Sequence, residues 1–317
     1  MTLDGVSKSY GAVKAVEDLS FDVRAGEMFG LIGPDGAGKT TIVRLMCGLL
    51  RPDAGTIRIF GHDPVREHRA VTGMVGYLSQ RFSLYGDLSI DENIAFFAEI
   101  HGVKGYRPRR DRLLSMTQLT PFRSRRTDQL SGGMKQKLAL ACTLVHQPPL
   151  IILDEPTTGV DPVSRREFWK LLSEFLGEGL TIVMATPYLD EAERCGRVAL
   201  VSEGRLLALE EPGTLQAAYP GQLVEVVASP YHQVPAALAG VAGVADVQLF
   251  GERAHVRLDI GAGLNAADRI RHALETGAGL TVTTVRPIEA SLEDVFIDRV
   301  RSGRDSGLGT RDSQGTK

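Results

Sequence analysis

A glycine-rich loop, GPDGAGKTT at residues 33–41, follows a short apolar segment and precedes a helical pattern. Glycines let backbone N–H groups curl around phosphates, and the following helix adds positive potential at its amino terminus. A lysine at this spacing reaches the β- and γ-phosphates, and the next hydroxyl can bind Mg²⁺. The alternative is a plain glycine turn with a chance lysine. We predict a nucleoside triphosphate site formed by Gly33, Gly36, Gly38, Lys39, Thr40 and Thr41.

Two adjacent carboxylates end the apolar segment LIILDE at residues 150–155. A strand of this kind places them at the carboxyl edge of a parallel sheet, beside the phosphate loop. Asp154 is then positioned to hold Mg²⁺, and Glu155 to take a proton from the water that attacks the γ-phosphate. Without the phosphate loop, an ordinary strand-end acid or helix cap would be the better interpretation.

The segment LSGGMKQ at residues 130–136 opens a helical pattern that runs to residue 146. Ser131 can cap this helix, and the glycines leave N–H groups bare at its positive end, where an anion can bind. Taken alone, Ser-Gly-Gly is more often a plain helix start. It stands about twenty residues before LIILDE, however. With these motifs, residues 1–219 resemble the ABC ATPase family, of which this segment is the signature sequence.

The resemblance implies a P-loop (RecA-like) ABC ATPase core with an amino-terminal antiparallel β subdomain, and it implies ATP and Mg²⁺ as ligands. In this family, Ser131 and Gly133 would contact the γ-phosphate held by the opposite subunit, so that dimerisation completes the site. The implied partners are a second ABC ATPase subunit, identical or different, and the transmembrane permease subunits of an exporter. Residues 33–41, 84–86 and 291–297 look most like subunits of ABC-2 type exporters, often linked to drug efflux.

Three further residues receive roles from the resemblance. Tyr10 looks like the aromatic residue that stacks on adenine. Gln80 resembles the glutamine that senses Mg²⁺ and the attacking water. Asp161 lies in the loop GVDP, through which the two subunits communicate. The alternatives are strand-end packing for Tyr10, a surface position for Gln80 and a helix N-cap for Asp161.

The segment RFSLYGD at residues 81–87 is the expected docking surface for the membrane partner, because its aromatic residues are unusual for a solvated loop. Core packing of Phe82 and Tyr85 is the alternative. Because the amino terminus suggests no export by a signal peptide, we expect the chain in the cytoplasm, peripheral on the inner face of the cell membrane through the permease subunits.

Pro187 stands where members of this family usually carry a histidine. As structure, Thr186 would cap the next helix and Pro187 would be its first residue. As chemistry, proline offers no side-chain donor to the γ-phosphate or to water, and losing a positioned imidazole costs roughly 10² to 10⁴ in rate. We expect slow or absent hydrolysis at this chain's own site, in an asymmetric pair with a competent second subunit.

Composition narrows the class of protein. With 36 basic and 39 acidic residues the net charge is -3, so no global positive field attracts nucleic acid. Nowhere do about 18 apolar residues run together, and the amino terminus lacks a signal-peptide pattern. Cys47, Cys142 and Cys195 are odd in number and far apart, which favours buried, reduced thiols over disulfides or zinc ligands.

The order of apolar runs and helical patterns predicts an α/β fold with a smaller second domain. We expect an ABC ATP-binding domain at residues 1–221 with a helical insertion at about 82–147, an α+β, ferredoxin-like accessory domain at 222–301, and a disordered tail at 302–317. The expected core strands are 28–32, 75–78, 150–153, 181–185 and 198–201, and the expected core helices are 40–50, 90–101, 132–146 and 163–176. In the accessory domain, strands at 223–227, 244–250, 255–258 and 280–285 alternate with helices at 234–239 and 266–275, and a closing helix follows at 291–300.

Two other functions stay open at this stage. A nucleotide-sensing regulatory module that binds ATP without turnover is favoured by Pro187. A soluble ABC protein that acts on DNA or ribosomes would need a long heptad insertion or tandem nucleotide domains, and the sequence has neither. The arginines between residues 107 and 112 are the only hint of nucleic acid, and a solvated helix face explains them. The accessory domain could bind a small ligand, stabilise a dimer or do neither.

Overall fold

The computed structural model describes residues 1–80, 83–259, 261 and 265–305. The chain divides into two compact units, one of Met1–Pro212 together with the chain end from Arg299, and one of Gly213–Asp298. This division lies earlier in the chain than the predicted domain end at residue 221. The predicted functional domains therefore stay predictions, and each unit is described by itself.

A six-stranded sheet forms the centre of the first unit. Its strands are β3 (Met28–Ile32), β5 (Val75–Leu78), β6 (Leu150–Asp154), β7 (Thr181–Thr186), β8 (Arg197–Ser202) and β9 (Arg205–Glu210). They lie in the order β5-β6-β7-β3-β8-β9, parallel from β5 to β8, with β9 antiparallel to β8. Every residue of β3, β6 and β7 is buried, as expected for continuous apolar runs in a sheet that is covered on both faces.

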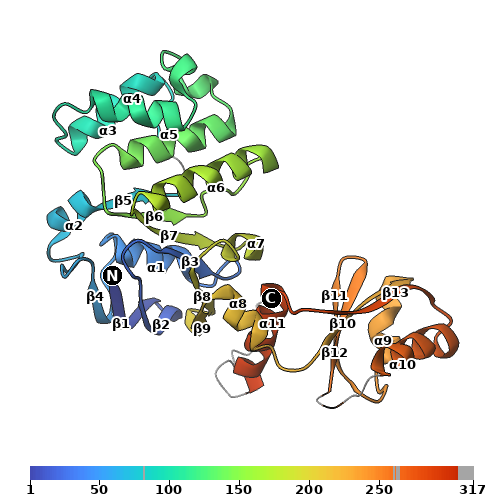
Figure 1. Ribbon diagram of the computed structural model, residues 1–317. Helices are drawn as coiled ribbons and strands as arrows, with labels where there is room; N and C mark the ends of the chain where they lie inside the picture. The colour runs from blue at the N-terminus through green and yellow to red at the C-terminus, as the bar shows by residue number, and fades with distance from the viewer. Residues whose placement is uncertain (81–82, 260, 262–264, 306–317) are drawn as a thin grey trace, which may run out of the picture. The chain divides into compact units, whose positions relative to one another are not determined.

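Helices cover this sheet, and α1 and α6 lie on opposite sides of it in Figure 1. The helices of this part are α1 (Lys39–Met46), α2 (His68–Met74), α6 (Pro162–Gly177) and α7 (Leu189–Ala192). A second, antiparallel sheet has the order β2-β1-β4 and contains β1 (Thr2–Tyr10), β2 (Val13–Asp22) and β4 (Ala54–Arg58). Both sheets share one core with α1, to which Leu19, Phe29 and Ile42 belong. The P-loop core with an antiparallel β subdomain is therefore confirmed.

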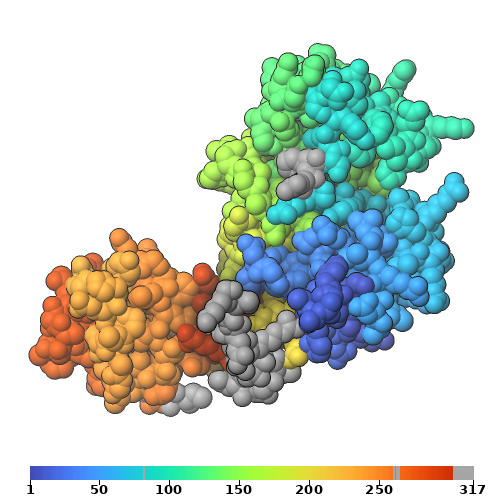
Figure 2. Space-filling view, turned by 180° about the vertical axis from the view of Figure 1, so that it is seen from behind, coloured from blue at the N-terminus to red at the C-terminus, as the bar shows by residue number. Residues whose placement is uncertain are grey.

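The described residues of the predicted insertion form helices joined by turns and loops, with no strand among them. It contains α3 (Ile90–Ile100), α4 (Arg107–Met116), α5 (Gly132–Leu144) and two short 3-10 turns, η1 (Thr120–Phe122) and η2 (Thr127–Gln129). Ser89 and Glu92 form a capping box that starts α3. Figure 2 shows this region from behind as a lobe beside the amino-terminal segments.

The second unit has the predicted β-α-β-β-α-β order. Its elements are α8 (Pro212–Ala217), β10 (Leu223–Ser229), η3 (Tyr231–Gln233), α9 (Val234–Leu238), β11 (Val244–Phe250), β12 (Arg253–Leu258), α10 (Ala266–His272), the π-helical turn η4 (Ala273–Gly277) and β13 (Thr281–Ile288). The antiparallel sheet has the order β11-β12-β10-β13. The core beneath one sheet face contains Val226, Val256 and Ile270, so the expected ferredoxin-like fold is present.

Two local predictions are wrong. Helix α11 (Leu292–Asp305) runs past residue 302, where the tail was expected to begin. The buried side chains of Leu292 and Val295 anchor the first turn of this helix, from which it continues. Helix α7 begins at Leu189, so Pro187 is not its first residue, and Thr186 does not cap it. The remainder of the predicted tail, residues 306–317, lies outside the described residues.

Candidate active site

The loop between β3 and α1 follows the predicted phosphate-binding path. Gly38 is the N-cap residue of α1 at φ 99°, a left-handed conformation that favours glycine. A Cβ atom on Gly33 would lie 2.2 Å from the Val201 carbonyl oxygen, so only glycine fits there. The loop is therefore packed against β8 and leads directly into the start of α1.

Lys39 is 3% exposed and turns back into this loop. Its ammonium group donates hydrogen bonds to the carbonyl oxygens of Gly33 (2.8 Å) and Pro34 (3.0 Å), and it lies 3.6 Å from Glu155 Oε1. A buried ammonium needs such partners, because its charge is costly away from water. The positive charge is thus concentrated inside the loop, where a polyphosphate would be bound. Thr41 lies two residues after Lys39 in α1.

Thr40 and Asp154 form a pair of oxygen ligands at the ends of two neighbouring elements. Thr40 Oγ1 donates to Asp154 Oδ1 over 3.2 Å, and Asp154 is 1% exposed. Burial raises the pKa of Asp154, and the charge of Glu155 adds to this shift, whereas the Thr40 hydrogen bond opposes it. Mg²⁺ prefers oxygen ligands of this kind and keeps several waters. The donor set fits the predicted magnesium position.

Glu155 and Gln80 come together although 75 residues separate them. Gln80 Nε2 donates to Glu155 Oε2 over 3.1 Å, and Thr158 Oγ1 donates to the same oxygen over 3.4 Å. Glu155 has φ 49°, and its backbone N–H donates to the Ala185 carbonyl oxygen over 2.8 Å. Residues other than glycine rarely adopt this conformation, which bends the chain at the end of β6 and directs the carboxylate toward Lys39.

A second group of predicted residues lies at the starts of α5 and α6. Ser131 caps α5 by accepting from the Met134 N–H over 3.3 Å, and Asp161 caps α6 by accepting from the N–H groups of Val163 and Ser164, each over 3.0 Å. A Cβ atom on Gly133 would lie 2.3 Å from Ser164 Oγ, so the two helix starts touch. Among the described residues, no hydrogen bond or ion pair joins this group to the Lys39 group.

Tyr10 ends β1 with 48% of its surface exposed. Among the described residues, no aromatic ring or cation packs against its ring, and the adenine-stacking role stays a prediction. In the predicted docking segment, Arg81 and Phe82 lie outside the described residues. Tyr85 is 46% exposed, and its ring packs edge-on against Phe96 with a centroid distance of 4.5 Å. The buried side chain of Asn93 accepts a hydrogen bond from the Tyr85 N–H and donates one to the Tyr85 carbonyl oxygen.

Comparison with known proteins agrees with this geometry. The family model described as ABC transporter matches residues 16–158. The daunorubicin resistance ATP-binding protein DrrA3 of Streptomyces coeruleorubidus is 36% identical over 94% of each chain. The chain belongs to the ATP-binding proteins of ABC transporters.

Another relative and two solved structures carry names of the same family. The probable multidrug ABC transporter ATP-binding protein YbhF of Escherichia coli (strain K12) is 39% identical over 99% of this chain, which spans 53% of that protein, about half its length. A solved structure titled as the ATP binding subunit of an ABC transporter has 30% identity and a TM-score of 0.63 over 68% of this chain and 91% of its own. The cassette MJ0796, in a dimer bound to ADP and Pi, has 25% identity and a TM-score of 0.60 over 66% and 97%.

Sequence reasoning missed a buried carboxylate in this ABC chain. Glu191 in α7 has an exposed fraction of 0%. It accepts hydrogen bonds from the loop after Glu155, from α6 and from the end of β7, through Thr157 Oγ1 (2.5 Å), Thr186 Oγ1 (2.6 Å), Arg165 Nε (2.8 Å) and Trp169 Nε1 (3.3 Å). The run YLDE at 188–191 is typical of an exposed helix start, so the sequence carried no signal for this network.

The Glu191 network fixes the segment that contains Pro187. Thr186 Oγ1 accepts from the Tyr188 N–H over 3.1 Å, and the Thr186 carbonyl oxygen accepts from the Gly33 N–H over 3.4 Å. The end of β7 is thereby tied both to Glu191 and to the phosphate loop. This explains why Thr186 is not available as a cap for α7: its hydroxyl group already serves Glu191 and Tyr188.

We expect Asp154→Asn to raise the free energy of unfolding of the nucleotide-free protein by about 1 kcal/mol. The folded-state pKa of Asp154 is raised, so its ionisation costs stability above that pKa, and the cost disappears as the pH falls through it. The advantage of the variant should therefore shrink in acid. Urea denaturation in magnesium-free buffer at several pH values measures it, and a variant less stable than wild type at neutral pH would contradict the burial argument.

Glu191→Gln should lower the free energy of unfolding by about 2 kcal/mol, because the new amide group would face donors instead of accepting from them. Glu174→Gln on the exposed face of α6 is the matched control and should change stability by less than about 0.5 kcal/mol. Thermal and urea unfolding of the two variants measure the difference. Equal free energies of unfolding for Glu191→Gln and Glu174→Gln would contradict a stabilising role of the network.

Proposed function

We propose that this chain is the ATP-hydrolysing subunit that energises an ABC-2 type membrane exporter. The observation that carries the proposal is the convergence of Lys39, the Thr40–Asp154 pair and the Glu155–Gln80 pair at one edge of the sheet. Relatives named as multidrug, daunorubicin resistance and Nod factor export ATP-binding proteins support export as the process.

In the proposed reaction, the loop N–H groups and the Lys39 ammonium group hold the β- and γ-phosphates of ATP. Thr40 and Asp154 would hold Mg²⁺, which neutralises charge on the phosphate oxygens when it is bound. Glu155 accepts a proton from the attacking water, and Gln80, hydrogen-bonded to the same carboxylate, orients that water. The Lys39 contacts with Gly33 and Pro34 exchange for contacts with phosphate oxygens.

The proposed working unit contains two ATPase subunits. Ser131 and Gly133 lie at the positive end of α5, and no interaction among the described residues ties them to this chain's own Lys39 group. They are therefore available to the γ-phosphate held by the partner. Asp161, fixed as the N-cap of α6 beside Gly133, would report the state of that contact to the neighbouring subunit.

We propose the segment around Tyr85 as the docking surface for the permease subunits. Its half-exposed ring rests on Phe96, and Asn93 holds its backbone in place, so an apolar group is presented on a rigid support. Within the described residues, no helix has both the length and the apolar character needed to cross a bilayer. Attachment through the permease would keep the chain on the inner face of the membrane, in the cytoplasm.

Pro187, in place of the histidine that this family usually carries, supports an asymmetric pair of ATPase subunits. The end of β7 is fixed by Glu191 and Gly33, so the backbone is in place, but the side chain at 187 has nothing to donate. Slow turnover at this site and normal turnover at the partner's site would follow. The same residue favours the second candidate function, a regulatory module that binds ATP without hydrolysing it.

We expect Pro187→His to raise the ATPase rate of the purified chain by about tenfold or more, because an imidazole at this position can donate to the γ-phosphate. Adding Glu155→Gln to that variant should remove the gain, since the proton acceptor is lost. Phosphate release under saturating Mg·ATP measures both. Brisk turnover by the unmodified chain alone, abolished by Glu155→Gln, would refute the asymmetric pair and leave the exporter assignment intact.

A further inference from the structure

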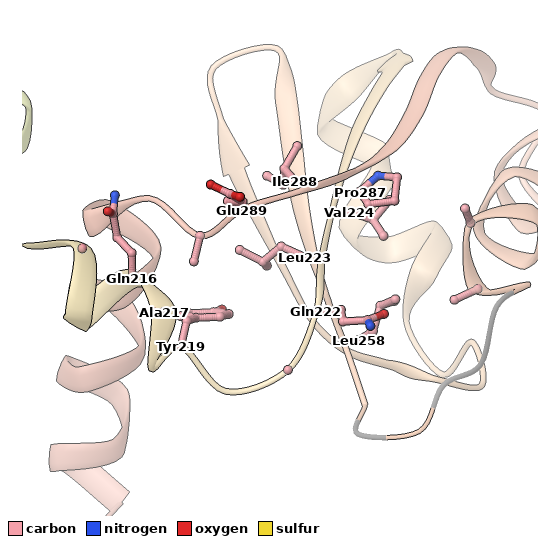
Figure 3. A pocket seen from close by; sticks show the side chains of 15 residues that line it. Gln216, Ala217, Tyr219, Gln222, Leu223, Val224, Leu258, Pro287, Ile288 and Glu289 are labelled. Carbon is pink, nitrogen blue, oxygen red and sulfur yellow. The ribbon is translucent and has the colours of Figure 1, made fainter.

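The second unit contains a cavity of about 780 Å³ that no part of the proposed ATPase chemistry uses. Its walls come from α8, the segment after it, the start of β10 and the ends of β12 and β13 (Figure 3), together with the start of α10. All of its lining residues belong to Gly213–Asp298. Cavities of about 300 to 1,000 Å³ hold drug-sized molecules, so a small organic ligand fits by size.

The part of the cavity seen in Figure 3 between α8 and the sheet is mainly apolar. Tyr219 and Leu223 extend into it from opposite sides, and Ile288 lies at the neighbouring strand end. Leu223 is 4% exposed, so the wall that it forms is part of the packed interior of this unit. Burial raises the pKa of Tyr219 to about 12, so its hydroxyl group is neutral at physiological pH, as it is in an ordinary tyrosine.

Glu289 is the only charged residue among those that line the cavity. It is exposed, and it has no hydrogen-bond or ion-pair partner among the described residues. Three other carboxylates of the same unit are paired: Glu225 with Arg253 and Arg286, Asp294 with His255, and Asp298 with Arg257. The cavity therefore combines apolar walls with one uncompensated negative charge at its rim.

We propose that this cavity binds a small organic cation with an apolar body. The Glu289 carboxylate pairs with the cationic group, the Tyr219 ring offers its negative face to the same charge, and Leu223 and Ile288 contact the apolar part. The site shares no residue with the phosphate loop. It gives the second unit a ligand-sensing role that does not depend on ATP hydrolysis.

Titration of the full chain with tetraphenylphosphonium and with tetraphenylborate tests this proposal by calorimetry. The two probes have nearly the same size and opposite charges, so apolar contact alone would not distinguish them. We expect saturable binding of the phosphonium ion and no saturable binding of the borate. Lys39→Ala should leave phosphonium binding unchanged, which separates this site from the nucleotide site and keeps the test independent of the proposed function.

Glu289→Gln should weaken phosphonium binding about fivefold, and Tyr219→Leu about threefold. Glu252→Gln, a change of an exposed carboxylate in the turn between β11 and β12, is the matched control and should leave the affinity as it is. Unfolding curves confirm that each variant is folded. Absence of phosphonium binding, equal binding of both probes, or equal affinities for Glu289→Gln and Glu252→Gln would overturn the proposal.

Discussion

The structure of the site depends on the interactions of one buried ammonium group, that of Lys39. Lys39 is 3% exposed, and its charge is balanced by two loop carbonyl oxygens and, at 3.6 Å, by the Glu155 carboxylate. Burying a charge without partners would be prohibitive, so the loop and the end of β6 must stay adjacent. Since β7 lies between β6 and β3 in the sheet, the parallel register of these strands is what brings the two chain segments to one edge.

Two groups of this site are held in energetically unfavourable states. Asp154 and Glu155 are neighbouring carboxylates, and the first is almost fully buried, with its pKa raised by that burial. Glu155 in addition adopts a left-handed backbone conformation. Groups held in such costly states are typical of functional sites, where the surrounding fold supplies the stability. The Glu191 network links the end of β7 to α6 and to the loop after Glu155, and it contributes to that stability.

Much of the fold was predictable because apolar runs and turn residues are local signals. The strands at 28–32 and 75–78 have the predicted bounds, and the β-α-β-β-α-β order of the second unit follows from alternating patterns. The Lys39, Asp154 and Ser131 positions could be read from motifs. The Glu191 network could not, because its donors are spread over residues 157–186 and meet only in the folded chain. The start of α7 was missed for a local reason: the Thr186 hydroxyl group donates to Glu191, five residues further along the chain, and α7 begins only at Leu189.

Calorimetric titration of ATP into the purified chain, with and without Mg²⁺, tests the central claim most directly. If a polyphosphate replaces the carbonyl partners of Lys39, the wild-type chain binds ATP in a magnesium-dependent manner and Lys39→Ala loses that binding while remaining folded. Magnesium-dependent binding of equal strength in both proteins, or none in the wild-type chain, would contradict the account of this loop.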